Sequence, residues 1–159
     1  MNIKGKVILI TGSSQGIGKA LAIKCLQQGA KVCINGRSAD RLQKTHEELN
    51  PWSTQLYAVA SDVSTDEGSK MVVEACVNHL GRLDILVCNA GMSAYGELEK
   101  TQPKVIHEVI DTNFKASALV VHFALPYLTT TGGSITLVSS LAGLHGLGGY
   151  SIYSASKMA

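Results

Sequence analysis

The chain has 159 residues, enough for one domain with a buried core, and 45% apolar with only 16% charged residues is typical of a globular protein. The net charge of +2 is too small to indicate binding to nucleic acid or to a membrane surface, and no apolar run is long enough to cross a bilayer. The four cysteines form no C-x-x-C pair, which favours a reduced, cytoplasmic protein over a disulfide framework. We therefore expect one cytoplasmic domain over residues 1–159.

Short apolar runs, typical of strands buried on both faces, alternate along the chain with helical periodicity. The first helix is expected to end near Gly29, and Ser38 is placed to cap the second. Strands are expected at residues 7–10, 31–35, 56–60, 83–87 and 134–138. This alternation predicts an α/β fold with a doubly wound parallel sheet of the Rossmann type, in the strand order 3-2-1-4-5.

Two of the later helices carry local signals at their ends. Ser64 and Glu67 have capping-box spacing at the start of a helix that runs to Gly81. A long helix is expected to start near Thr101, and Pro126 should bend or weaken its last turns. The apolar stripe of that helix is expected to contain Ile106, Val109, Ile110, Phe114 and Val120.

A glycine-rich turn joins the first strand to the first helix. Glycines there let the backbone approach a pyrophosphate closely, and the helix N-terminus offers it free N–H groups. A plain strand–helix turn is the alternative, but the position after a strand and before a helix favours nucleotide binding. The residues expected to contact the nucleotide are Gly12, Ser13, Ser14, Gln15, Gly16, Ile17 and Gly18.

The end of the second strand bears on which dinucleotide binds. An NAD site usually places an acidic residue about 20 residues after the glycine turn to hold the ribose 2′-hydroxyl. This chain instead reads Asn-Gly-Arg-Ser at residues 35–38, with no carboxylate. Because a guanidinium suits a 2′-phosphate, Arg37 predicts a preference for NADP(H), with NAD(H) still possible. The alternative is that Arg37 is only an exposed surface charge.

Near the end of the chain, a phenol and an ammonium stand four residues apart, at Tyr153 and Lys157. On a helix these side chains share a face. A free phenol, with a pKa of about 10, is a poor acid or base at neutral pH, but a nearby ammonium favours the phenolate. The spacing alone does not distinguish a catalytic pair from a surface pair.

Taken in order, these motifs resemble the short-chain dehydrogenases/reductases over essentially the whole chain. The glycine turn Thr11-Gly12-x-x-x-Gly16-x-Gly18 is similar to the family's cofactor turn, and Asp62-Val63 to its adenine-contacting motif. The segment Cys88-Asn89-Ala90-Gly91 is similar to the family's Asn-Asn-Ala-Gly motif, with cysteine in place of the first asparagine. The positions that match its four catalytic residues are Asn113, Ser140, Tyr153 and Lys157.

The resemblance implies an NADP(H)-dependent oxidoreductase that interconverts a carbonyl and an alcohol by hydride transfer. Tyr153 would exchange a proton with the substrate oxygen, and Ser140 would hydrogen-bond that oxygen. Lys157 would bind the nicotinamide ribose and favour the phenolate, while Asn113 would hold a water that links Lys157 to solvent. No metal is required, the partner is a small carbonyl or alcohol, and no nucleic acid or membrane is expected. The cofactor set also includes Asp62, Val63, Asn89, Ala90, Gly91, Tyr153 and Lys157.

Several of these positions have structural alternatives. Asn113 could be an amide that stabilises a helix kink, and Ser139 competes with Ser140 as the serine at the strand end. Tyr150 competes with Tyr153, but only Tyr153 has a lysine four residues on. A loop that includes His145 is expected to border the substrate. Two further positions could be purely architectural, Asp62 as a turn cap and Asn89 as a tie between strands.

The sequence stops at Ala159, whereas family members continue through further helix and strand. The resemblance therefore implies a C-terminally incomplete domain with five of the usual seven strands. We expect a fraying last helix and an apolar fifth strand left uncovered. The alternative function is a catalytically inactive nucleotide-binding fragment, and a homo-oligomer is expected only for a longer chain.

Overall fold

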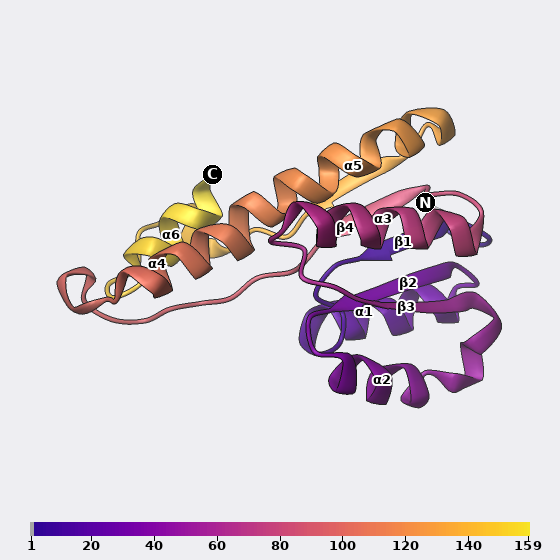
Figure 1. The fold of residues 1–159 in the computed structure, drawn as a ribbon, viewed down its shortest axis with the longest axis horizontal. Coiled ribbons are helices and arrows are strands. Elements are labelled where there is room, and N and C mark those ends of the chain that lie inside the picture. The colour runs from indigo at the N-terminus through magenta and orange to yellow at the C-terminus, as the bar shows by residue number, and fades with distance from the viewer. Residues whose placement is uncertain (1) are drawn as a thin grey trace.

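The computed structural model describes residues 2–159, and its five parallel strands pair in the order β3-β2-β1-β4-β5 (Figure 1). The predicted fold class and strand order are thus confirmed. The strands are β1 (Val7–Ile10), β2 (Lys31–Gly36), β3 (Leu56–Ala60), β4 (Ile85–Cys88) and β5 (Ser134–Leu137). The helices are α1 (Gly16–Gln27), α2 (Ala39–Glu48), α3 (Asp66–Leu80), α4 (Pro103–Ile110), α5 (Ala116–Thr131) and α6 (Ser151–Met158).

The central strand β1 is apolar at every position because helices cover both faces of the sheet (Figure 1). Successive side chains of a strand point to opposite faces. Val7 and Leu9 therefore pack in the core formed with α3 and α5. Ile8 and Ile10 pack in the core formed with α1 and α2.

The strand register brings three chain segments to one edge of the sheet. Ile10, the last residue of β1, is level with Ile34 of β2 and Val87 of β4. In parallel strands the residues that follow all leave the sheet at its carboxyl edge, where ligands bind in open α/β folds. This edge collects the glycine-rich turn, Arg37 and Asn89.

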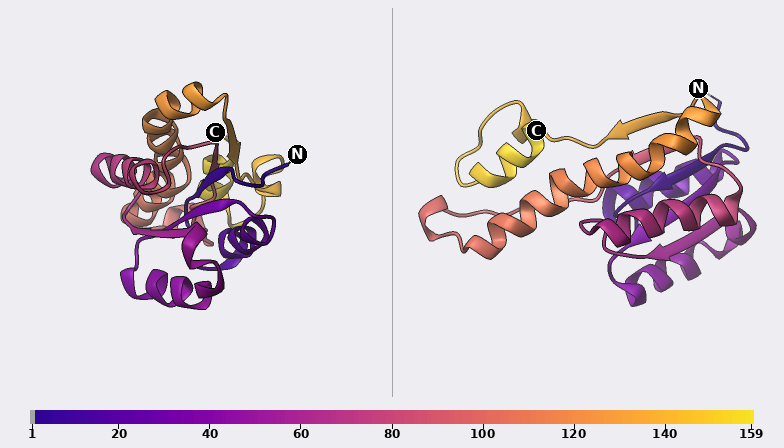
Figure 2. Two further views of the ribbon diagram at one scale, coloured as in Figure 1. Left: turned by 90° about the vertical axis from the view of Figure 1, so that its right-hand side faces the viewer. Right: turned by 45° about the horizontal axis from the view of Figure 1, so that its top comes forward.

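The long predicted helix consists of α4, a π-helical turn (Asp111–Lys115) and α5, which together extend beyond the sheet and lie beside α6 (Figure 2). The helix continues through Pro126 and ends at Gly132, whose backbone is left-handed. Phe114, one of the apolar residues expected on this helix, lies in the π-helical turn and is 47% exposed. The wider π turn shifts the side-chain register, so the apolar repeat of a regular helix does not hold there.

The predicted capping box at Ser64 and Glu67 is also wrong. The N-cap of α3 is Thr65, whose hydroxyl accepts a hydrogen bond from the N–H of Gly68 (3.0 Å). Ser64 does not cap because Asp62 binds both its N–H (2.9 Å) and its hydroxyl (2.7 Å). This local turn moves the helix start by one residue.

At the edge of the sheet, all four residues of β5 are exposed, as expected for an uncovered fifth strand. Ile135 is 39% and Leu137 62% exposed. Within residues 2–159, none of the helices has the combined length and apolar character needed to cross a bilayer.

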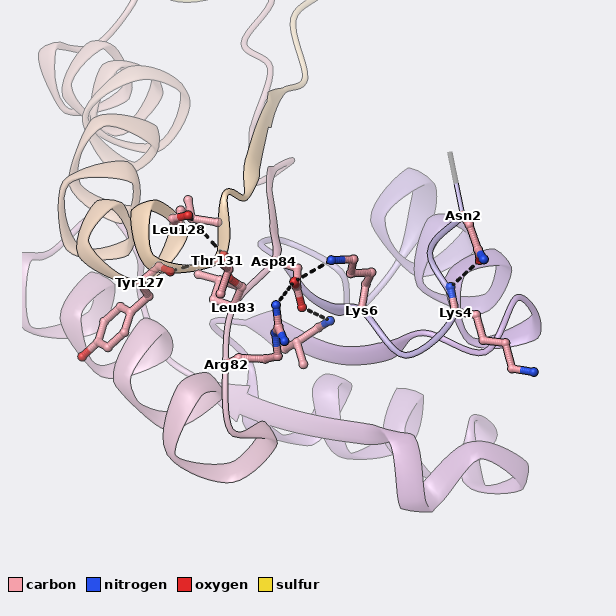
Figure 3. A network of polar contacts seen from close by, with 10 residues as sticks. Asn2, Lys4, Lys6, Arg82, Leu83, Asp84, Tyr127, Leu128 and Thr131 are labelled. Atoms are coloured by element: carbon pink, nitrogen blue, oxygen red, sulfur yellow. Dashed lines mark hydrogen bonds and ion pairs between the residues drawn. The ribbon is translucent and has the colours of Figure 1, made fainter.

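A buried carboxylate joins the beginnings of β1 and β4 (Figure 3). Asp84 is 3% exposed and accepts hydrogen bonds from the N–H of Val7 (2.9 Å), from Lys6 (3.1 Å) and from Arg82 (2.6 Å). Burial alone would raise the pKa of Asp84, but these three donors outweigh it and hold the pKa below its ordinary value. The backbone of Asp84 also binds Val7 and Ser134, so one residue links three strands.

We expect Asp84→Asn to lower the free energy of unfolding at pH 7 by about 1–3 kcal/mol, because it removes the charge from a site built for an anion. The folded-state pKa lies below the unfolded value of about 3.9, so the stabilisation is present above that pH and is lost as pH falls through the folded pKa. Urea unfolding of both proteins at pH 7 and pH 3 should show the difference shrinking in acid. The exposed substitution Asp66→Asn is the control, and an equal difference at both pH values would contradict the prediction.

Candidate active site

A cleft of about 500 Å³ opens at the carboxyl edge of the sheet. Most of the residues predicted to hold the cofactor lie on its wall. They are Gly12, Ser14, Gln15, Gly16, Ile17, Arg37, Asp62, Val63, Asn89, Ala90 and Gly91. Four other residues predicted to bind the cofactor do not line the cleft. Ser13 and Gly18 lie buried beside it, and Tyr153 and Lys157 lie on α6.

Two glycines of the turn are required by close backbone packing. Gly12 has a φ of +62°, and a Cβ there would lie 2.7 Å from the Cα of Ala90. A Cβ on Gly18 would lie 2.5 Å from the Asn89 amide nitrogen. The turn therefore packs directly against the segment after β4, which brings the backbone to the cleft wall.

Asn35 braces the glycine turn. This role could not be predicted from the sequence, where the residue only indicated that the end of the second strand has no carboxylate. Its backbone accepts from the N–H of Ser13 (2.8 Å) and donates to the Ser13 hydroxyl (2.9 Å). Its side-chain amide donates to the carbonyl of Val59 (3.0 Å) and to the Ser61 hydroxyl (3.0 Å). Because Asn35 is 1% exposed, a carboxylate here would be buried and would lose these amide donor bonds.

The predicted 2′-phosphate and adenine residues face each other across the cleft. Nη1 of Arg37 lies 4.0 Å from Oδ2 of Asp62, and both side chains are substantially exposed. A surface pair at this distance contributes little to stability. Arg37 is thus available to an anion in the cleft, while Asp62 also forms the turn with Ser64 described above.

Asn89 links the end of β4 to the glycine turn after β1, which is the architectural role that the sequence offered as an alternative to cofactor binding. Its amide nitrogen donates to the carbonyls of Thr11 (2.9 Å) and Gly12 (3.0 Å). The Thr11 hydroxyl in turn accepts from the N–H groups of Asn89 and Ala90, each at 3.0 Å. Asn89 therefore fixes the cleft wall in addition to lining it, and its partner is Thr11, the first residue of the glycine-turn motif.

Asn113 lies in the π-helical turn and is 7% exposed. Its side chain accepts from the N–H of Met92 (2.8 Å) and donates to the carbonyl of Met92 (2.9 Å) and to the Ser156 hydroxyl (2.8 Å). The amide thus joins three segments, in agreement with the alternative that it stabilises a helix irregularity. Ser156, adjacent to Lys157 in sequence, was missed because nothing in a short hydroxyl on a helix predicts a partner 43 residues away.

Lys157 brings α6 to the cleft. Its ammonium donates to the carbonyl of Val138 (2.9 Å), at the end of β5. A Cβ built on Gly91 would lie 3.4 Å from Nζ of Lys157 and 3.3 Å from Oδ1 of Asn113. Both predicted catalytic side chains therefore lie next to one residue of the cleft wall, but they line a second cavity, between the π-helical turn, the end of β5 and α6, and not the cleft itself.

The two adjacent serines after β5 differ in their hydrogen bonds. The hydroxyl of Ser139 donates to the carbonyl of Lys157 (2.9 Å) and so braces α6. The hydroxyl of Ser140 accepts from the N–H of Ala142 (3.2 Å) and donates to no atom of residues 2–159. Of the two, Ser140 has a proton available for a substrate oxygen.

Tyr153 is half-buried on α6, one helical turn before Lys157. In the described part of the chain, no hydrogen bond joins its hydroxyl to Ser140 or to Lys157. Its ring lies against that of Tyr150, with centroids 6.0 Å apart. The structure thus places Asn113 and Lys157 near Gly91, and Tyr153 on the same helix as Lys157. His145 is exposed in the loop before α6.

A protein-family model described as short chain dehydrogenase matches residues 6–159. The chain belongs to this family. It is 38% identical to an uncharacterized oxidoreductase of Thermotoga maritima, over 100% of this chain and 63% of the relative. It is 35% identical to hydroxynaphthalene reductase arp2 of Aspergillus fumigatus, over 99% of this chain and 58% of the relative.

Solved structures of the family share the fold. A short-chain dehydrogenase/reductase of Burkholderia phymatum in complex with NAD superposes with a TM-score of 0.95 at 28% identity, covering 99% of this chain and 57% of that one. A short-chain dehydrogenase of Mycobacterium smegmatis has a TM-score of 0.93 at 28% identity, with 99% and 67% covered. This short-chain dehydrogenase chain therefore spans between half and two thirds of the length of these proteins.

Cys88 is where this short-chain dehydrogenase departs from the Asn-Asn-Ala-Gly motif. The thiol is 3% exposed in the core beneath α5, with its sulfur 4.0 Å from the carbonyl of Ser117. Burial raises the pKa of Cys88 to about 11, so the side chain behaves as a neutral, apolar group. The substitution leaves the Asn89 tie in place.

Proposed function

We propose that this short-chain dehydrogenase is an NADP(H)-dependent oxidoreductase that interconverts a carbonyl and an alcohol, with Tyr153 as its acid and base. One observation carries the proposal. Lys157, one turn from Tyr153, reaches Gly91 on the wall of the nucleotide cleft. Lys157 therefore brings the helix that carries Tyr153 up to one residue of the cleft wall, and this is where a hydride and a proton would reach one carbonyl.

The cleft fits a dinucleotide. The bare backbone at Gly12 permits close approach of a pyrophosphate, and the N-terminus of α1 supplies free N–H groups to it. Arg37 would hold the 2′-phosphate, and Asp62 and Val63 would contact the adenine. When bound there, the nicotinamide supplies or accepts the hydride.

The side chains of α6 and its neighbours provide the proton chemistry. In the reducing direction, the Tyr153 hydroxyl donates its proton to the carbonyl oxygen, and the free proton of Ser140 hydrogen-bonds the same oxygen. The Lys157 ammonium favours the resulting phenolate by its charge. The Val138 carbonyl holds the Lys157 ammonium beside Gly91, and Asn113, next to the same glycine, would hold the water that links Lys157 to solvent.

The preference for NADP(H) rests on Arg37 and on the absence of a carboxylate from residues 35–38 at the end of β2. The matched Burkholderia phymatum enzyme was crystallised with NAD, so the family fold alone does not favour either cofactor. We expect NADPH to bind more tightly than NADH by about 10- to 100-fold, the value of charge-assisted hydrogen bonds of about 1.5–3 kcal/mol.

Calorimetric titration of the wild type, Arg37→Ala and Lys44→Ala with each cofactor tests this preference. Arg37→Ala should lose about 10- to 100-fold in NADPH affinity and little in NADH affinity, and the exposed control Lys44→Ala should change neither. Tighter binding of NADH by the wild type would overturn the interpretation of Arg37.

The second candidate is a nucleotide-binding fragment without catalysis. The observation behind it is the exposure of all four residues of β5. The chain covers 63%, 58% and 52% of the lengths of three relatives. NADPH binding without reduction of any carbonyl would identify the fragment. The four cysteines are unpaired, which supports a reducing, cytoplasmic location in either case.

A further inference from the structure

Three tyrosine rings form a chain that ends at Tyr153. The centroids of Tyr150 and Tyr153 are 6.0 Å apart with an interplanar angle of 61°, and those of Tyr95 and Tyr150 are 5.1 Å apart with an angle of 58°. These are the separations of mutually attracting, tilted aromatic pairs. Tyr95 belongs to the loop between β4 and α4, so the rings join two segments that are distant in sequence.

The ring of Tyr95 is held in place although it is 77% exposed. The N–H of Gly96 donates to the carbonyl of Gly149 (2.9 Å), which ties the two loops together. A Cβ on Gly149 would lie 2.5 Å from Cε2 and 3.1 Å from Cζ of Tyr95, so the ring rests directly on this glycine. The ring therefore presents a fixed aromatic surface to solvent beside Tyr150.

The neighbouring surface carries both charged and apolar side chains. Glu97 and Lys100, in the same loop as Tyr95, form an ion pair with each other. The loop before Tyr150 instead exposes aliphatic side chains, among them Leu144 at 75% and Leu147 at 44%. A substrate that approaches Tyr153 past these rings can therefore contact aromatic faces and aliphatic side chains.

We propose that Tyr95 and Tyr150 form an aromatic wall that stacks against a flat, conjugated ring, so the substrates are aromatic or conjugated cyclic ketones and the matching alcohols. Stacking along the wall places a carbonyl next to the ring beside the Tyr153 hydroxyl. That such ketones are substrates rests on the proposed function of Tyr153. That a flat ring binds to Tyr95 and Tyr150 does not depend on that function.

Binding of two ketones of equal carbon number tests the wall. Acetophenone has a flat ring and cyclohexyl methyl ketone a puckered one, and the second is no less apolar, so burial alone does not favour acetophenone. We expect the 159-residue chain to bind acetophenone more tightly by about 2- to 10-fold, measured by ligand-observed NMR titration with and without NADPH. Equal affinity for the two ketones, or no binding of either, would overturn the proposal.

Substitutions separate the wall from the catalytic chemistry. Tyr95→Leu and Tyr150→Leu should each reduce the preference toward one, and Tyr95→Leu changes an exposed side chain, so its fold should persist. Tyr153→Phe should keep the preference because its ring remains, even if turnover is absent. His79→Leu, which removes one ring of the stacked pair with Tyr57 on another surface, is the control. A preference that survives both leucine substitutions would show that the wall does not bind the ring.

Discussion

Tyr153→Phe should lower turnover of a carbonyl substrate by about 100- to 10,000-fold, the usual contribution of a positioned acid or base. The substitution removes one hydroxyl from a half-buried ring and leaves the packing against Tyr150 intact. Because Lys157 keeps its bond to Val138, the cleft wall at Gly91 should be unchanged, and so should the NADPH dissociation constant. NADPH oxidation at 340 nm, followed with saturating ketone, measures turnover, and calorimetry measures binding.

Two further phenylalanine variants make this test specific. Tyr127→Phe, on α5, is the control and should retain full activity. Tyr150→Phe keeps its ring but loses its hydroxyl, so it should also remain active. Turnover abolished by Tyr150→Phe and retained by Tyr153→Phe would exchange the roles of the two tyrosines. A wild-type chain that binds NADPH without turnover would instead support the fragment.

Gly12→Ala should weaken NADPH binding by more than about tenfold and lower the free energy of unfolding by about 2–5 kcal/mol. Backbone strain at the positive φ accounts for about 1–2 kcal/mol of this and overpacking for about 1–3 kcal/mol. The clash is with the Cα of Ala90 at 2.7 Å, and backbone cannot rotate away as a side chain can. Relief requires the segment after β4 to move, which would displace the cleft wall held by Asn89.

Gly5→Ala is a matched control for this prediction. Gly5 has a comparable φ of +73°, but a Cβ there would have no neighbour within 4 Å. It should cost only the conformational strain, about 1–2 kcal/mol, and leave NADPH affinity unchanged. Thermal unfolding and NADPH titration of both variants separate close packing from backbone strain, and equal effects would show that the approach to Ala90 is unimportant.

The sequence was sufficient for the order of the elements because period-two and period-3.6 patterns are local. The predicted bounds of β1 and β3 match the observed ones. The predicted start of β4 is wrong, because Asp84 lies before the strand and its carboxylate accepts hydrogen bonds from Lys6 and Arg82. The predicted capping box was wrong for a similar reason, because the Ser64 hydroxyl donates to Asp62 and does not cap the helix. Local patterns do not record which polar group another segment will bind.

The candidate site divides in the same way. Glycine spacing, the missing carboxylate at the end of β2 and the Tyr153–Lys157 pair could be read directly because each depends on neighbours within a few residues. The choice of Ser140 over Ser139 could not, because it depends on the bond from Ser139 to the carbonyl of Lys157. The family resemblance pointed to Ser140 as the catalytic serine. The hydrogen bonds of the structure show which group each of the two serines binds.

The sequence by itself determined that this chain folds as a doubly wound parallel sheet with a nucleotide turn at its carboxyl edge. Hydrophobic periodicity and glycine placement act over a few residues and need no partner. Tertiary structure alone decided the π-helical turn at Asn113, the Asn35 brace and the aromatic wall at Tyr95. Each depends on contacts between segments far apart in the chain, and the free energy of such contacts exists only once the sheet register has brought those segments together.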